Sequence, residues 1–241
     1  MCTVTYIPHK DKIFLASNRD EKHSRADAIA PKAYEFSTGK IFFPKDAQAN
    51  GTWIALHENG NAMVLLNGGF QKHEPVYPYR KSRGLIFLDI MDSDWMLDKY
   101  KTISLENIEP FTLVMYRDGE LYECRWDGKQ KYIEEKDITV PHIWSSVTLY
   151  DNETIAKRKL WFEEFIQKNA QPQMDDIFHF HHFGGEGDEV NDIRMNRNGV
   201  LYTVSVTGIE LDSEKAFLKY IDLKNEQSYT SSFNFSTSPT H

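Results

Sequence analysis

Cysteine is scarce in this chain, which has only Cys2 and Cys124 among 241 residues. Two cysteines exclude a disulfide framework and a four-cysteine zinc site. The 13 glycines and 9 prolines are too few for a collagen-like or low-complexity chain. No apolar run approaches the roughly 18 residues of a membrane span, and the N-terminal segment lacks the features of a signal peptide. These absences predict a cytoplasmic protein with no membrane span.

Positive charge is also in deficit, with 28 Lys and Arg against 36 Asp and Glu and a net charge of −8. Binding to nucleic acid without sequence preference needs clustered Lys and Arg against the phosphates. Nucleic acid is therefore not an expected partner. What the chain does contain is 40% hydrophobic and 13% aromatic residues, enough for a globular domain with a large core.

The pattern of apolar residues predicts hairpins near both ends of the chain and helices between them. Asn59-Gly60 and Asp118-Gly119 each separate two apolar runs, and such dipeptides favour tight hairpin turns. The expected strands are 2–7, 12–17, 52–57, 62–66, the runs FTLVMY and ELYECRW on either side of the second turn, 190–195, 200–206 and 217–223. The expected helices are 82–100 with a break near Ser93, 153–168 and 174–182. This order predicts an α+β layered domain.

The domain is expected to be single and to cover residues 1–227. No linker, internal repeat or change of composition divides this part of the chain. Residues 228–241 contain eight Ser and Thr and no Lys, Arg, Asp or Glu. Such a composition is typical of a disordered tail, which we expect here.

Cys2 is the first candidate for chemistry because of its position. The initiator methionine is commonly removed when a small residue follows it, and removal would place a thiol and a free α-amine on one residue. The amine has an ordinary pKa near ~8, so it can accept the proton of its own thiol. Cys2 would then be an N-terminal nucleophile; the alternative is a small hydrophobic residue that opens the first strand.

A charged tetrapeptide, Asn18-Arg19-Asp20-Glu21, directly follows the strand-like run KIFLAS. If the first two strands form a hairpin, the end of the second lies near the start of the first. Arg19 would favour the thiolate of Cys2, and Asp20 could hold the amine. The alternative is a solvated cluster of charges in a turn.

The start MCTVTYIP, followed by SNRDE, resembles the NRDE family, also called the transport and Golgi organisation protein 2 family. The resemblance continues in order through most of the chain, at Gly51-Thr52-Trp53, Leu66-Asn67-Gly68-Gly69, Ser82-Arg83-Gly84, Glu109-Pro110-Phe111 and Ser145-Ser146 before the helix that carries Arg158. It implies a four-layer αββα sandwich like that of the N-terminal nucleophile hydrolases. The nearest chemistry is that of cysteine amidases acting on penicillin V and on conjugated bile salts.

Carried over residue by residue, the resemblance makes Cys2 the nucleophile, Arg19 the arginine that faces the thiol and Asp20 the aspartate that binds the amine. Asn67 matches an asparagine that donates to the oxyanion, and its alternative is a turn former before two glycines. The late arginine of the bile-salt enzymes has no counterpart in the strand around Tyr202, and Ser145 is only a positional candidate for a second asparagine. The implied reaction is hydrolysis of a non-peptide C–N amide bond in a small acyl amide.

The alternative function is a carrier of the same fold that binds haem or a lipid-like acyl group. The family resemblance carries a link to haem and lipids, and 15 Phe, 12 Tyr and 5 Trp could line a pocket or simply form the core. A histidine-rich run, His179, His181 and His182, could supply a haem ligand, but its phenylalanines favour an aromatic packing segment. The sequence therefore predicts neither a cofactor nor a metal site. Cys124 is expected to be a buried small hydrophobic residue.

Overall fold

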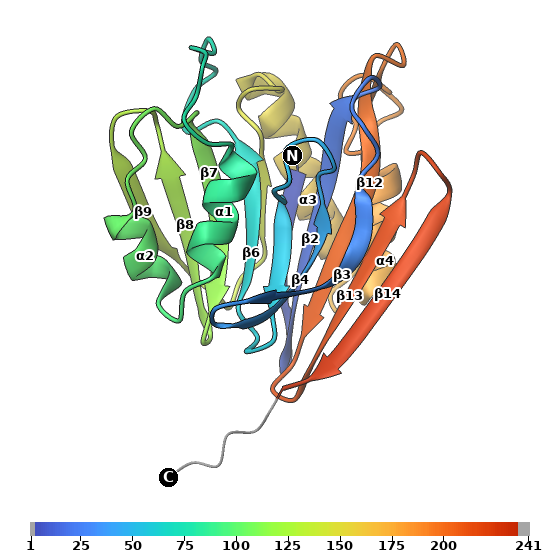
Figure 1. The fold of residues 1–241 in the computed structure, drawn as a ribbon. Helices are drawn as coiled ribbons and strands as arrows, with labels where there is room; N and C mark the ends of the chain where they lie inside the picture. The colour runs from blue at the N-terminus through green and yellow to red at the C-terminus, as the bar shows by residue number, and fades with distance from the viewer. Residues whose placement is uncertain (1–2, 236–241) are drawn as a thin grey trace.

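Two antiparallel β-sheets packed face to face form the centre of the molecule in the computed structural model, which describes residues 3–235 (Figure 1). The first sheet contains β1 (Thr3–His9), β2 (Lys12–Lys22), β10 (His142–Ser145), β11 (Asn196–Arg197), β12 (Leu201–Leu211), β13 (Lys215–Asp222) and β14 (Gln227–Asn234). The second contains β3 (Ile29–Phe36), β4 (Gly39–Lys45), β5 (Ile54–His57), β6 (Ala62–Asn67), β7 (Phe111–Arg117), β8 (Glu120–Trp126) and β9 (Lys131–Lys136). The predicted hairpin turns are confirmed between β5 and β6 and between β7 and β8.

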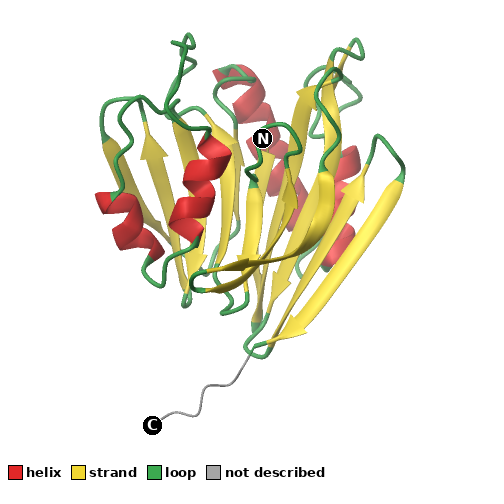
Figure 2. Cartoon of the chain, viewed as in Figure 1, coloured by secondary structure: helices red, strands yellow, loops and turns green. Residues whose placement is uncertain are grey.

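Within residues 3–235, four helices cover the outer faces of the two sheets (Figure 2). They are α1 (Arg83–Met91), α2 (Met96–Thr102), α3 (Asn152–Lys168) and α4 (Met174–Phe183). The first two lie on the second sheet, and the last two lie on the first (Figure 1). The four-layer αββα sandwich is thereby confirmed. None of the described helices is long and apolar enough to cross a membrane.

Helix boundaries follow local capping chemistry. Ser82 precedes α1 and its side chain accepts a hydrogen bond from the backbone of Leu85, while Asp151 caps α3 by accepting from the backbone of Thr154. These bonds satisfy N–H groups that have no partner inside the helix. The predicted helical region 82–100 is indeed divided, since α1 ends before Ser93 and α2 begins after it.

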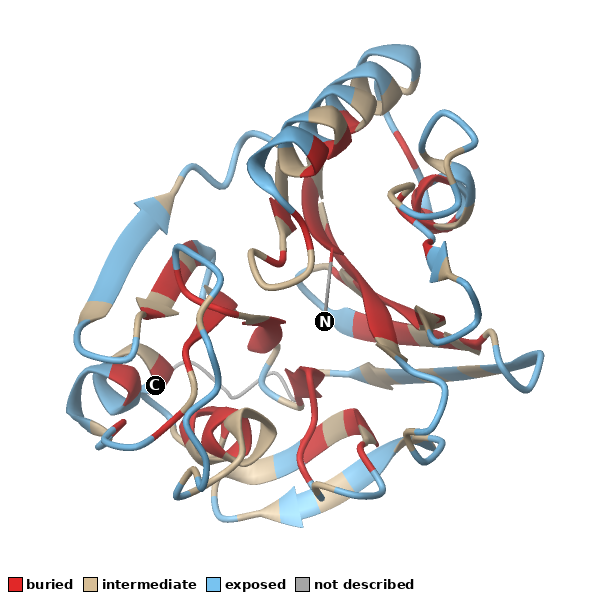
Figure 3. Cartoon of the chain, turned by 90° about the horizontal axis from the view of Figure 1, so that it is seen from above, coloured by how far each residue is buried: buried red, intermediate tan, exposed pale blue. Residues whose placement is uncertain are grey.

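The main core lies between the two sheets and continues under α1 and α2, and a second apolar layer lies between the first sheet and helices α3 and α4. Buried segments of both sheets face one another in the view from above (Figure 3). Side chains alternate along β2, so Leu15 enters the core between the sheets while Phe14 and Ala16 face the helices. The same alternation sends Arg19 and Asp20, at the end of this strand, to opposite faces of the first sheet.

Several parts of the chain differ from the sequence prediction, and they include β9 and β10, two strands that the apolar pattern did not predict. Residues 190–195 form turns instead of a strand, and the segment 29–45 forms β3 and β4, which the apolar pattern did not reveal. The disordered tail expected from residue 228 is wrong for 228–234, because β14 pairs with β13 along its length. Phe233 of β14 stacks on Phe42 of the second sheet with 4.3 Å between ring centroids, and this contact outweighs the polar composition of the segment. The remaining tail residues, 236–241, lie outside the described residues.

Candidate functional site

The site that the sequence predicts lies where β1 begins. Thr3 pairs with Asn18 of β2 on one side and with Ser145 of β10 on the other. Cys2, the predicted nucleophile, lies outside the described residues. The structure therefore describes the surroundings of the chain immediately after Cys2, and these include Arg19 and Asp20, which follow Asn18.

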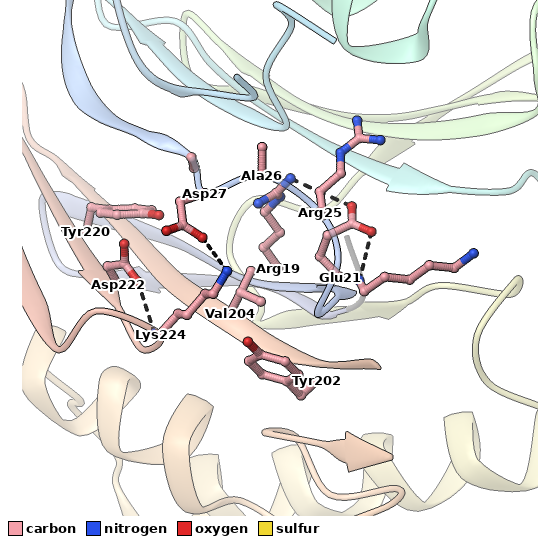
Figure 4. Close-up of a pocket in the computed structure, with 12 residues that line it drawn as sticks. Arg19, Glu21, Arg25, Ala26, Asp27, Tyr202, Val204, Tyr220, Asp222 and Lys224 are labelled. Carbon is pink, nitrogen blue, oxygen red and sulfur yellow. Dashed lines mark hydrogen bonds and ion pairs between the residues drawn. The ribbon is translucent and has the colours of Figure 1, made fainter. Parts of the chain in front are cut away.

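Arg19 is buried and is held in place from three directions. Its Nη2 donates to Asp46 Oδ2 at 2.7 Å, its Cζ lies 4.4 Å from the centroid of the Trp53 ring, and Glu21 Oε2 is 3.7 Å from Nη2. Figure 4 shows this guanidinium beside Glu21, with the Asp27–Lys224 ion pair on its other side. A buried guanidinium fixed by a carboxylate and an aromatic face is a rigid positive charge.

Asp46 connects Arg19 to Arg25 and to the loop that follows β4. It accepts from both guanidinium groups and from the backbone N–H of Ala49. Burial on its own would raise the pKa of the Asp46 carboxyl, but the N–H of Ala49 and the two arginines outweigh it and lower this pKa below its ordinary value. Asp46 is thus ionised at neutral pH and orients Arg19.

The depressed pKa of Asp46 predicts a pH-dependent effect of Asp46→Asn. A carboxyl whose pKa is lower in the folded state stabilises the fold above its unfolded pKa and loses that effect as pH falls through the folded pKa. Urea unfolding should show the variant less stable by about 1–3 kcal/mol at pH 7, with a difference that shrinks in acid below about pH 4. A constant difference across this range would contradict the ion-pair role. Asp118→Asn, at an exposed turn, is the control.

Asp20 lies on the opposite face of β2 from Arg19. Its two carboxylate oxygens accept hydrogen bonds from the hydroxyls of Tyr150 and Thr203, each at 2.6 Å. Asp20 is only 4% exposed, so these bonds stabilise a buried carboxylate. Arg19 and Asp20 are neighbours in the sequence but enter two separate environments.

A fully buried arginine, Arg158 of α3, joins the environment of Asp20 to the start of β1. Its Nη1 donates to the hydroxyl of Thr3 at 2.5 Å, and its Cζ lies 3.6 Å from the ring centroid of Tyr150. Its other nitrogens donate to the backbone carbonyls of Asn191 and Asp192. Helix α3 thereby holds the first described residue of the chain and, through Tyr150, the carboxylate of Asp20.

Asn67 ends β6 in a tightly packed turn. Its backbone carbonyl accepts from the hydroxyl of Ser146 at 2.9 Å, and Gly68 follows with φ of +87°. A Cβ on Gly68 would come within 2.6 Å of Val147, so a side chain there would push the 145–148 segment away. Within the described part of the chain the carboxamide of Asn67 makes no hydrogen bond. The backbone of Asn67 therefore belongs to the turn, while its side-chain amide is left to contact a ligand.

Arg19 and Asn67 line the same cavity, which has a volume of about 580 Å³. Its walls come from the end of β2, the loop before β5, the end of β6 and the segment that leads into α1. Trp53, Tyr77 and Tyr79 contribute aromatic surface, and Glu109 pairs with Arg83 at one side. The volume is in the range of sites for small organic ligands. We refer to it as the Arg19 cavity.

The family is decided by sequence: the model of Transport and Golgi organisation 2 matches residues 1–196. The chain belongs to that family. The resemblance carried by MCTVTYIP and SNRDE is thereby confirmed. No curated protein is significantly similar to the chain.

This member of the Transport and Golgi organisation 2 family shares its fold with two solved amide-cleaving enzymes, as their titles describe them. An N-acylethanolamine-hydrolyzing acid amidase ortholog of Caenorhabditis elegans is similar with a TM-score of 0.61 and 11% identity, covering 86% of this chain and 92% of that one. A mutant conjugated bile acid hydrolase of Clostridium perfringens is similar with a TM-score of 0.57 and 10% identity, covering 100% of this chain and 99% of that one. At 10–11% sequence identity, the structural similarity shows that the fold is shared.

Of the histidine-rich run in this family member, His181 is part of the core, whereas His179 is exposed and His182 is half-buried. Nδ1 of His181 lies 2.6 Å from Asn18 Oδ1, which can only accept, and Nε2 lies 2.8 Å from the hydroxyl of Thr5. Burial, aided by His182 and Arg158, lowers the pKa of His181 to about 3, so the ring is neutral. Both ring nitrogens are engaged, and His181 is therefore not available as a haem ligand. The described residues contain no cluster of side chains that could hold a metal ion.

Sequence reasoning missed several residues that surround the site. Asp46, Trp53, Tyr150 and Arg158 fix the two charged residues that the sequence singled out. Trp53 and Arg158 lie in segments that carried the family resemblance, but nothing local in those segments assigns a partner. The useful signal would have been the helical spacing of Ile155, Arg158 and Phe162, which places a charged residue on the apolar face of the predicted helix.

Proposed function

We propose that the chain is an N-terminal cysteine hydrolase that cleaves a non-peptide C–N amide bond in a small acyl amide. The observation that carries this proposal is that Arg19 and Asn67, which come from different sheets, line one cavity beside the start of β1. The family and the fold support it, since the similar solved structures are titled as an acid amidase and a bile acid hydrolase.

The proposal requires the thiol of Cys2 to lie on the same face of the first sheet as Arg19. Adjacent Cα atoms are about 3.8 Å apart, so Cys2 is one peptide from Thr3, which pairs with Asn18. Side chains alternate along a strand, and Val4 lies in the core between the sheets. A one-residue extension of β1 would meet the requirement, with the thiol near Arg19.

The chemistry begins with removal of Met1, which frees the α-amine of Cys2. The amine accepts the thiol proton, and the positive charge of Arg19 favours the thiolate. The thiolate attacks the amide carbonyl carbon, and the carboxamide N–H of Asn67 donates to the oxyanion, an interaction worth about 3–4 kcal/mol. Asp20 holds the ammonium group in place.

Collapse of the tetrahedral intermediate breaks the C–N bond. The ammonium returns its proton to the leaving nitrogen, so a free amine departs and a thioester remains on Cys2. Water, deprotonated by the same amine, attacks the thioester carbonyl. The acyl group leaves as a carboxylic acid, and the thiol is regenerated. No oxidant or metal is needed for this balance.

Intact mass spectrometry tests the proposal directly. Protein from cells should have lost one methionine from the 28.1 kDa chain, and incubation with a library of acyl amides should add an acyl mass to the peptide that contains Cys2. Retention of Met1 would refute the mechanism, because an amide nitrogen cannot accept the thiol proton. Binding of an acyl ligand with Met1 removed and no acyl-enzyme would instead support the non-catalytic carrier.

A further inference from the structure

The strands at the ends of the two sheets differ in how well they are protected against pairing with another molecule. Over residues 3–235, the path of the first sheet ends in β10 and β14, and the path of the second ends in β3 and β9. The outer edge of such a strand carries N–H and C=O groups without a strand partner, and proteins protect it with charge, proline or a short length.

Three of these four strands are protected in one of these ways. β10 is only four residues long. β9 is charged at four of its six positions, Lys131, Glu134, Glu135 and Lys136. β3 contains a proline and two charged residues, Pro31, Lys32 and Glu35. A further strand at these edges would lose hydrogen bonds or meet a row of charges.

β14 has none of these protections. Its eight residues, QSYTSSFN, include no charged residue and no proline, and they pair with β13 along their whole length. On its other side β14 has no strand within the described residues, and Figure 1 shows it as the outermost strand of the first sheet. At about 3.4 Å per residue this open edge is roughly 27 Å long. It is therefore the edge at which a further strand can pair.

The sequence of β14 is self-complementary when a second copy runs antiparallel to it about Ser231. Residues directly opposite one another in an antiparallel pair have side chains on the same face. This register places Tyr229 opposite Phe233 of the second copy, and the two-fold axis repeats the contact. It also places Thr230 opposite Ser232 of the second copy, again twice. Aromatic pairs and hydroxyl pairs both stabilise adjacent strands, and no like charges oppose each other along the edge.

The side chains that make these pairs are already in position. Tyr229 and Phe233 are half-buried, with ring centroids 6.1 Å from Tyr220 and 4.3 Å from Phe42, respectively. Because these contacts hold the two rings, pairing with a second copy orders few additional groups. The hydroxyl-bearing positions on the other face of the strand are exposed.

We infer that the chain forms a two-fold symmetric dimer in which the β14 strands of two copies pair antiparallel and join their first sheets into one continuous sheet. About six to eight backbone hydrogen bonds form across the axis. The partner is a second copy because the register that pairs the aromatic rings also pairs the hydroxyls and opposes no like charges. The inference does not depend on the proposed function, since no residue of β14 lines the Arg19 cavity.

Sedimentation equilibrium of the native protein tests the dimer directly. The average mass should rise with protein concentration, over the micromolar range, toward twice the 28.1 kDa of one chain. The mass of a single chain at every concentration would overturn the inference.

Two double substitutions at exposed positions form a matched pair. Thr230→Glu with Ser232→Glu sets carboxylates opposite one another at both symmetric contacts and should weaken the dimer at least about tenfold. Thr230→Glu with Ser232→Lys sets opposite charges there and should keep the dimer. Lys219 of β13 lies opposite Thr230 in the same chain, so the shared glutamate has a favourable neighbour in both variants. Equal loss in both, or no loss in either, would contradict pairing about Ser231.

The effect of net charge is controlled by Val140→Glu with Leu160→Glu. These side chains are 42% and 58% exposed and lie outside β14, and the variant carries the same added charge as the double glutamate variant. It should stay dimeric. Dissociation of this variant as well would assign the effect to net charge and contradict the interface at β14.

Oxidative crosslinking tests the two-fold axis even if the charged variants do not fold. Cysteines are introduced into Cys2→Ala protein, whose remaining Cys124 is buried. Ser231→Cys lies on the axis, with about 5 Å between the Cα atoms of the two copies, a separation that suits a disulfide. Ser228→Cys lies about 20 Å from its own counterpart. Copper phenanthroline in air should convert the Ser231→Cys protein, and not the Ser228→Cys protein, to a covalent dimer; equal yields would overturn the inference.

Discussion

Cys2→Ala is expected to lower kcat/KM for any acyl amide that the native protein hydrolyses by at least about 10⁴-fold, because no other group can form the thioester. The variant retains the free α-amine, the cavity and the surrounding charges. Substrate should therefore still bind, and the loss should appear in kcat. Steady-state hydrolysis, followed by release of the amine, measures the effect.

Cys124→Ala is the matched control for that experiment. Cys124 lies in β8 and is completely buried, and burial raises the pKa of its thiol to about 12. A thiol in this environment is neither ionised nor accessible at neutral pH. The control should keep full activity, whereas activity that survives in Cys2→Ala would exclude the thioester mechanism.

The layers of the fold could be predicted because their apolar patterns are local. Residues 62–66 and the FTLVMY run are continuous buried strands, and the helix over 153–168 has its own cap at Asp151. β3 and β14 could not be predicted because both are largely exposed edge strands of their sheets, with few buried positions to create a period of two. Their place depends on contacts with distant strands.

The candidate site likewise has residues that the sequence could predict and partners that it could not. Cys2, Arg19 and Asp20 could be selected from position and residue type alone, and Asn67 from the family resemblance. Their partners could not, since Asp46 is 27 residues from Arg19 and Arg158 is 155 residues from Thr3. Sheet pairing brings these residues together, and the alternation of side chains along β2 then separates Arg19 from Asp20. A hairpin predicted from sequence does not specify which face each charge enters.

Arg158→Met is expected to destabilise the fold by about 3 kcal/mol and to lower the melting temperature by roughly 6–12 °C. Methionine replaces the apolar stem of the arginine but makes none of its hydrogen bonds, so the hydroxyl of Thr3 and the carbonyls of Asn191 and Asp192 lose a buried donor. The contact with the Tyr150 ring is lost as well. Urea unfolding and thermal melting measure the effect.

Arg197→Met provides the comparison, because Arg197 approaches the same Tyr150 ring at 5.4 Å but is only half-buried and lies outside the Thr3 contact. Its loss should cost no more than about 1 kcal/mol. If the two variants were equally stable, Arg158 would not be the residue that fixes the start of β1. A second measurement is the rate at which iodoacetamide alkylates Cys2 in each folded variant. If Arg158→Met slowed this reaction and Arg197→Met did not, helix α3 would be shown to position the nucleophile through the bond from Arg158 to Thr3, which are 155 residues apart in the sequence.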